Sequence, residues 1–229
     1  MVPMEMINPP QSEDELLKRA WEIAGQRLGE IANKLNRKTP EDLLRNKGWI
    51  GETLELALGA TAGSKPEPDF QLIGVELKTI PVRPDGQPKE TTHVCTVPMT
   101  KINGMTWNNS LVKEKLSKVL WIPVEYDQQI NLADRKIGAP LLWSPSAEEE
   151  SQLKTDWEEF MELISLGEID QITAHLGEVL QIRPKAANSH ALSEGIGKEG
   201  KTIKTLPRGF YLRTSFTATL LQKYYQINI

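Results

Sequence analysis

The sequence has almost no cysteine and no cluster of residues that would bind a transition metal. Cys95 is the only cysteine of the 229 residues, which excludes a disulfide framework and a cysteine-based zinc site. The three histidines, His93, His175 and His190, lie too far apart to form a local metal motif, and we interpret each as an ordinary surface or core residue. No serine stands in a G-x-S-x-G sequence, so a serine-hydrolase elbow is absent as well.

Long apolar runs, repeats and low-complexity tracts are also missing. No stretch approaches the roughly 20 apolar residues that span a bilayer, and the first residues, MVPMEMINPPQ, show no basic segment followed by an apolar one. We therefore expect a soluble, unexported protein of the cytoplasm with no membrane partner. A length of 229 residues without a Gly/Ser-rich linker predicts one domain covering residues 1–229.

Charge is distributed unevenly along the chain. The formal net charge is −4, which by itself argues against a nucleic-acid partner. Residues 147–170 carry nine acids against one lysine, whereas residues 175–229 carry eight bases against three acids, so the last part of the chain can face a phosphate backbone. The acidic stretch is expected to form an amphipathic helix with a solvated acidic face, which could also bind a protein partner. Its apolar positions recur at helical spacing: Leu153, Trp157, Phe160, Met161 and Ile164.

Local patterns predict a chain of mixed α/β class. Strands are expected at residues 69–80, 91–97, 118–124 and 177–183, where apolar and β-branched residues alternate or run together. The helix signals are a capping box, a proline in a first turn, an apolar stripe and a serine cap. They stand at Ser12–Glu15, Thr39–Pro40, residues 47–60 and Ser110.

The segment DFQLIGVELK, residues 69–78, contains the pattern with the most chemical content. On a strand, Glu76 and Lys78 project from one face and Leu77 from the other, because side chains alternate with period two. Asp69 precedes a bend expected at Gly74, so the folded-back chain can bring its carboxylate to the Glu76 side. Two hard oxygen ligands suit Mg²⁺, and a bound metal beside a lysine is the smallest set of groups that could catalyse phosphodiester hydrolysis. The same alternation of charged and apolar residues is also typical of any half-solvated strand.

A second pattern imitates a nucleotide-binding loop. Residues 195–202, GIGKEGKT, satisfy G-x-x-x-x-G-K-[ST], which alone would indicate an NTPase in which Lys201 holds phosphate. That loop needs a buried strand before it and a helix after it. The preceding residues lack strand character, and Pro207 makes a following helix unfavourable. We therefore prefer a flexible basic loop that touches a phosphate backbone.

Several blocks along the chain, in order, resemble the MutH family of methyl-directed mismatch-repair endonucleases. The resemblance runs from Lys47 to Leu212 and is far more specific than the D, E-x-K spacing, whereas residues 195–202 depart from the family pattern. The blocks are KGWIG (47–51), GSKPEPDF (63–70), GVELKTIP (74–81), VLWIPVE (119–125), LLWSP (141–145), LQIRPKAAN (180–188) and LPRGFYL (206–212).

The resemblance implies a fold and an activity. The expected fold is restriction-endonuclease-like, with a mixed central sheet flanked by helices and two lobes around a DNA-binding cleft. Within the single domain, residues 1–105 would form the catalytic sublobe and residues 106–229 the DNA-recognition sublobe. The expected activity is Mg²⁺-dependent nicking of the unmethylated strand at hemimethylated GATC sites in double-stranded DNA. MutL and MutS are the implied protein partners, and nicking a single strand suggests a monomer.

The resemblance also assigns roles to residues. Asp69 and Glu76 would bind Mg²⁺ directly, with the Leu77 carbonyl as a further ligand. Glu55 would be an outer or second-metal carboxylate, and Lys78 would orient or help deprotonate the attacking water.

Further positions are implied to contact DNA, in two groups. Arg183, Pro184, Lys185 and Tyr211 would read bases, with Tyr211 as the sensor of adenine methylation unless it merely packs in the core. Lys47 and Lys115 would contact phosphates, although solvated lysines are common. A non-catalytic DNA-binding repair adapter of the same fold is the main alternative to the nuclease.

Overall fold

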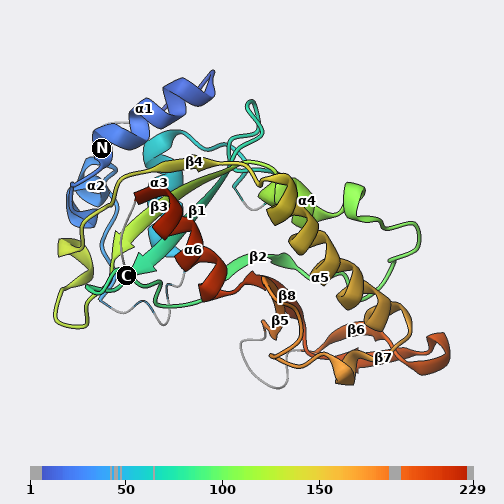
Figure 1. Ribbon diagram of the computed structural model, residues 1–229. Helices are drawn as coiled ribbons and strands as arrows, with labels where there is room; N and C mark the ends of the chain where they lie inside the picture. Colours follow the sequence, from blue (N-terminus) through green and yellow to red (C-terminus); the bar gives the residue numbers. More distant parts are fainter. Residues whose placement is uncertain are drawn as a thin grey trace. The chain divides into compact units, whose positions relative to one another are not determined.

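The computed structural model describes residues 7–41, 43, 46, 48–63, 65–185 and 192–225, and its chain divides into two compact units (Figure 1). The first unit consists of Met1–Glu90, Ser117–Ser144 and Leu220–Ile229, and the second of Thr91–Leu116 and Pro145–Thr219. Both units are discontinuous in sequence, and a boundary near residue 105 would fall inside the first segment of the second unit. No helix in the described ranges combines the length and apolar character that a membrane crossing needs.

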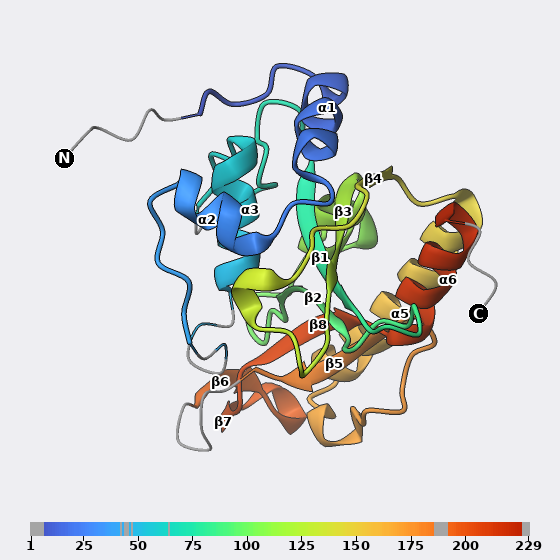
Figure 2. The ribbon, with the colours of Figure 1, turned by 90° about the vertical axis from the view of Figure 1, so that its left-hand side faces the viewer.

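The first unit contains a three-stranded mixed sheet in the order β1-β3-β4. β1 pairs in parallel with β3, and β4 is antiparallel to β3, so the predicted mixed α/β class is confirmed. The helices α2 and α3 lie to one side of β1 and β3 in Figure 2. The elements are α1 (Glu13–Ile23), α2 (Leu28–Lys34), α3 (Trp49–Leu58), β1 (Glu76–Val82), β3 (Val119–Glu125), the 3₁₀ turn η2 (Leu132–Asp134) and β4 (Leu141–Trp143).

One face of this sheet forms the core with the helices. Leu77 of β1 packs in one cluster with Leu120, Ile122 and Val124 of β3 and with the apolar faces of α1, α2 and α3. The side chains of β1 on either side of Leu77 therefore point to the opposite face. This alternation fixes the direction of Glu76 and Lys78.

The helix predictions in the first unit are partly confirmed. Ser12 caps α1, with its Oγ accepting a hydrogen bond of 3.1 Å from the backbone N–H of Glu15. The helix expected at Thr39–Pro40 is wrong for the described residues there, because 39–41, 43 and 46 are not helical. The chain instead forms α2 earlier, where Leu28, Ile31 and Ala32 are buried by tertiary packing.

The second unit contains an antiparallel sheet in the order β2-β8-β5 and a separate hairpin, β6-β7. Figure 1 shows α5 lying beside β5 and β8. The elements are β2 (Thr92–Thr96), η1 (Trp107–Asn109), α4 (Leu111–Leu116), α5 (Ala147–Ser165), η3 (Ile169–Gln171), β5 (Leu180–Pro184), β6 (Ser193–Ile196), η4 (Lys198–Gly200), β7 (Thr202–Thr205) and β8 (Arg208–Leu212). A last helix, α6 (Thr214–Tyr225), begins in the second unit and ends in the first.

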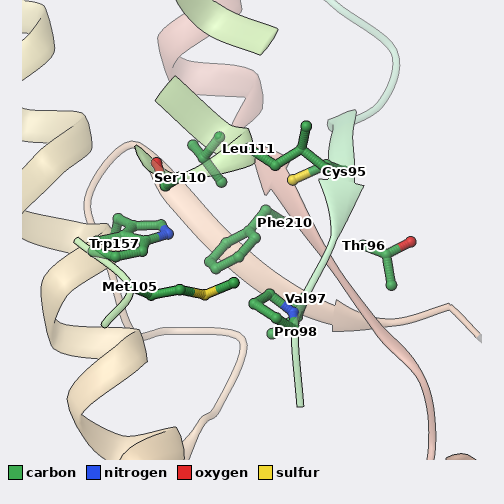
Figure 3. Close-up of a pocket in the computed structure, with 10 residues that line it drawn as sticks. Cys95, Thr96, Val97, Pro98, Met105, Ser110, Leu111, Trp157 and Phe210 are labelled. Atoms are coloured by element: carbon green, nitrogen blue, oxygen red, sulfur yellow. The ribbon is translucent and has the colours of Figure 1, made fainter. Parts of the chain in front are cut away.

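The inner face of this sheet is apolar. The Phe210 ring of β8 meets Phe160 of α5 edge to face, with ring centroids 6.2 Å apart. Beside it lies a pocket of about 280 Å³, in which Figure 3 shows Phe210 near Trp157, Met105 and Cys95. Because side chains alternate along a strand, Gly209 and Tyr211 belong to the other face of β8.

Helix α5 forms as predicted, but one of its acids is not solvated. Asp156 is only 3% exposed and lies among the apolar residues of the inner face. Its carboxylate accepts hydrogen bonds from the backbone N–H groups of Glu178, Val179 and Leu180, at 2.7 to 3.0 Å. The expectation of a wholly solvated acidic face is therefore wrong at this position, since these otherwise orphaned N–H groups require a buried acceptor.

The nucleotide-loop look-alike folds as a β-hairpin. Gly195 and Ile196 end β6, Thr202 begins β7, and the two strands pair directly. A strand, β7, begins directly after Lys201 where an NTPase loop would have a helix, so the anion-binding geometry of that loop is missing and its rejection is confirmed. The expected flexible loop is also corrected, because the strand pairing gives the segment regular structure.

Candidate active site

Strand β1 carries a buried ion pair. The Nζ atom of Lys78 lies 2.6 Å from Oε1 of Glu76, whose side chain is only 2% exposed. The two residues share a strand face, as their spacing predicts, while Leu77 between them packs in the core. Burial makes the loss of either partner costly, because the remaining charge would lie unpaired in a medium of low dielectric constant.

A tight turn brings Asp69 to the same strand. The chain reverses between Phe70 and Val75, which form a bridge pair, and Gly74 adopts the left-handed conformation with φ of +64°. Asp69, 8% exposed, accepts a hydrogen bond of 2.8 Å at Oδ2 from the backbone N–H of Leu77. The strand expected over residues 69–80 thus begins later, at Glu76, and its first residues form the turn that orients Asp69.

Helix α3 contributes Glu55 to the same cluster. Burial, followed by the negative charges of Asp69 and Glu76, raises the pKa of Glu55 from 4.5 to about 7, although the Lys78 ammonium acts in the opposite direction. The four predicted catalytic side chains are therefore electrostatically coupled. Three carboxyl groups and one ammonium leave an excess of negative charge that a divalent cation would offset.

The donor set fits Mg²⁺ better than a softer metal. All candidate ligands are oxygens: the carboxylates of Asp69 and Glu76 and the carbonyl of Leu77. No group of three or more His, Cys, Asp or Glu side chains forms a ready metal cage in the part of the chain that the structure describes. Mg²⁺ suits such a site, because it typically binds one or two carboxylates and keeps several water ligands.

Glu55→Gln is expected to stabilise the metal-free protein at pH 8 but not at pH 4.5. Glu55 is protonated in both states below the unfolded pKa of 4.5, so the substitution changes little there. As the pH rises to about 7, only the unfolded state ionises readily, and wild-type stability falls by about 2 kcal/mol after allowance for partial exposure. Urea unfolding in EDTA at the two pH values measures the difference.

Glu52→Gln is the matched control for this experiment. Glu52 lies on the same helix but is exposed, with its Oε2 atom 3.0 Å from Nη2 of Arg37. Its substitution should change stability by only about 0.5 kcal/mol. If Glu55→Gln gives the same change at both pH values, the raised pKa of Glu55 in the folded protein is wrong.

Most of the predicted DNA-binding residues lie in the second unit. Arg183, Pro184 and Lys185 are exposed at the end of β5, where a nucleic acid can reach them. Tyr211 is half-buried on β8, and burial raises its pKa. Lys115 is only 8% exposed, which makes it the least accessible of these positions. Lys47, the remaining phosphate-contact prediction, lies outside the described residues.

Two neighbours of Tyr211 were not predicted from the sequence. His93 of β2 pairs with Tyr211 in the sheet, and its ring meets the tyrosine ring at a centroid distance of 5.1 Å. Gly209 lies two residues before Tyr211 on the same strand face. A single histidine gives no sequence signal of this kind, since only strand pairing across distant segments brings it to Tyr211.

Comparison with known proteins identifies the family. A family model described as "DNA mismatch repair enzyme MutH" matches residues 58–156, a range that contains Asp69, Glu76 and Lys78. The DNA mismatch repair protein MutH of Vibrio cholerae is 59% identical over 94% of this chain and 98% of its own length. Its counterpart in Klebsiella pneumoniae is 58% identical over 96% of this chain and 95% of its own. MutH of Escherichia coli is 55% identical over 98% of both chains. At such identity over nearly its whole length, the chain belongs to the MutH family of DNA mismatch repair enzymes.

Proposed function

We propose that this protein is a Mg²⁺-dependent endonuclease of mismatch repair that nicks the unmethylated strand at hemimethylated GATC sites. The family membership supports the repair role. The observation that carries the chemistry is the convergence of Asp69, Glu76 and Lys78 at the start of β1. Buried carboxylates beside an ammonium fit metal-assisted phosphodiester hydrolysis, because such a site can hold a divalent cation and offset charge on phosphate.

Each side chain of the cluster has a distinct proposed role. Asp69, Glu76 and the Leu77 carbonyl would hold Mg²⁺, which when bound supplies Lewis-acid activation of water and phosphate. Lys78, as the ammonium paired with Glu76, would orient the attacking water and offset charge on the phosphate in the transition state. Glu55 is an outer carboxylate whose pKa of about 7 allows it to exchange a proton near neutral pH. The expected product ends are a 3′ hydroxyl and a 5′ phosphate.

DNA recognition is assigned to the exposed end of β5 and to Tyr211. Arg183 and Lys185 can donate hydrogen bonds to guanine O6 and N7 in the major groove. A ring packed close to adenine N6 could exclude a methyl group there, which is the role proposed for Tyr211. Pro184 restricts the backbone between Arg183 and Lys185, the two cations proposed to contact bases. Lys47 and Lys115 are the proposed phosphate contacts.

The cellular setting follows from the same proposal. A nick in one strand requires one active site, so we propose a monomer that acts on double-stranded DNA in the cytoplasm. MutL and MutS are the proposed activating partners.

A plasmid assay tests the proposed activity. Supercoiled DNA that contains unmethylated or hemimethylated GATC sites should be converted to the nicked form in Mg²⁺ and not in EDTA. A plasmid of equal length without GATC, and one methylated on both strands, should be cut much more slowly. Specific binding to GATC duplex without any metal-dependent nicking, also after MutL is added, would instead identify a non-catalytic adapter.

A further inference from the structure

We propose that His93 and Gly209 are positioning residues that hold the Tyr211 ring in place, and that this fixed ring sets the discrimination between unmethylated and methylated adenine. The inference rests on the proposed role of Tyr211 in reading DNA. It adds two residues that would act through Tyr211 rather than on the base.

The sheet register places His93 directly beside Tyr211. His93 of β2 pairs with Tyr211 of β8, and the next pair along these strands is Cys95 with Phe210. The extra residue on β2 is a bulge, which keeps His93 on the face of Tyr211 and Cys95 on the opposite face with Phe210. The direct pairing therefore places the imidazole beside the tyrosine, and the bulge after it puts Cys95 opposite Phe210.

The two rings meet edge to face. Their centroids are 5.1 Å apart and their planes differ by 67°. This is a favourable aromatic geometry, which adds to the stabilisation from the area that the rings bury. The imidazole thus restricts rotation of the tyrosine ring on one side.

Gly209 leaves the space that both rings occupy. A Cβ atom at this position would lie 2.9 Å from Cε2 of Tyr211 and 3.1 Å from Cδ2 of His93. Either ring would have to move to admit even an alanine. The close approach of the rings to the strand backbone therefore depends on glycine.

Arg183 limits the ring on another side. Its guanidinium carbon lies 5.8 Å from the Tyr211 centroid, and its Nη1 donates a hydrogen bond of 2.9 Å to Oγ1 of Thr91. Tyr211 is thus held by β2, by its own strand and by the proposed guanine-binding arginine of β5. Because Arg183 contacts the Tyr211 ring, the proposed guanine contact and the proposed adenine contact depend on each other.

Rigidity matters because a methyl group is a small signal. One methylene in a pocket changes binding about 10- to 200-fold, and only if the wall of the pocket does not move aside. A ring that rotates freely could swing away from an N6-methyl group and lose the difference. Restraint by His93 and Gly209 converts the extra methyl into a steric penalty.

Binding ratios test the proposal without depending on catalysis. The dissociation constants for unmethylated and doubly methylated GATC duplexes are measured by fluorescence anisotropy in EDTA. The discrimination is the dissociation constant for methylated duplex divided by that for unmethylated duplex. His93→Ala should lower this ratio about 5-fold or more while leaving affinity for GATC-free duplex unchanged. His93→Phe, which keeps an edge-on ring, should restore most of it. Gly209→Ala should also lower the ratio if it remains folded.

A double-mutant cycle with Tyr211→Ala identifies the route of the effect. If His93 acts through Tyr211, removing the histidine in the Tyr211→Ala background should change the ratio no further. Additive effects would overturn the proposal, because they would mean that His93 contacts DNA itself. An unchanged ratio in His93→Ala, alongside a reduced one in Tyr211→Ala, would also overturn it and leave the role of Tyr211 intact. An unchanged ratio in Tyr211→Ala would defeat the proposed sensor and the inference together.

Discussion

Asp69→Asn is expected to lower the rate of DNA nicking at least about 10³-fold, equivalent to ~4 kcal/mol of transition-state stabilisation. The substitution keeps the shape of the side chain and an oxygen that can accept the 2.8 Å hydrogen bond from Leu77. It removes the negative charge that the proposed metal site requires. The rate is measured in single turnovers on hemimethylated GATC duplex over a range of Mg²⁺ concentrations.

Asp85→Asn serves as the matched control. Asp85 also accepts a backbone hydrogen bond, 3.0 Å from the N–H of Gln87, but it is exposed in the turn after β1. Its substitution should leave nicking unchanged. DNA binding in EDTA should be retained by both variants, since loss of a carboxylate does not weaken attraction to phosphate. Nicking by Asp69→Asn within 10-fold of wild type would remove Asp69 from the proposed metal site.

Asp69 is a cleaner position for this experiment than Lys78. Substitution of Lys78 removes the ammonium 2.6 Å from the buried Glu76 carboxylate. The loss of one partner from a buried pair typically costs about 3–5 kcal/mol of stability. A fall in activity could then reflect unfolding rather than chemistry.

Asp156→Ala is expected to destabilise the protein by about 3–5 kcal/mol, the range seen when a buried hydrogen-bond network is broken. Its carboxylate accepts from three successive backbone N–H groups where the chain enters β5. Alanine would leave these groups buried without that acceptor. Chemical denaturation followed by far-UV circular dichroism measures the change in the free energy of unfolding.

A surface acid of the same helix provides the comparison. Glu158 is exposed and lies 3.7 Å from Lys154, one turn away. Glu158→Ala should cost no more than about 0.5 kcal/mol. Equal effects of the two substitutions would show that the hydrogen bonds of Asp156 contribute little.

The sequence predicted those elements whose signals are local. The cap at Ser12 and the strand beginning near Val119 follow from side-chain chemistry and apolar alternation within a few residues. β4 was missed because it has only three residues, and β8 was missed because pairing with the distant strands β2 and β5 stabilises it. α6 was missed because β-branched threonines fill its first turns, where intrinsic helix propensity is low.

The Asp156 position shows how a sequence signal can be misread. It falls between Leu153 and Trp157 in the apolar stripe of α5, so helical periodicity already assigned it to the inner face. Charge alone led to the interpretation that it was solvated. The backbone N–H groups that justify its burial lie in a segment far along the chain.

The sequence by itself determined that Glu76 and Lys78 share a strand face, because side-chain alternation is a property of the local backbone. The bend at Gly74 likewise predicted that Asp69 reaches this pair. The sequence blocks that match MutH in order also indicated the family. Only the tertiary structure decided that Glu55 joins these three residues, and that His93 and Gly209 enclose Tyr211. Helix packing and strand pairing bring those groups together over long sequence separations, and such contacts depend on the packing of the whole unit.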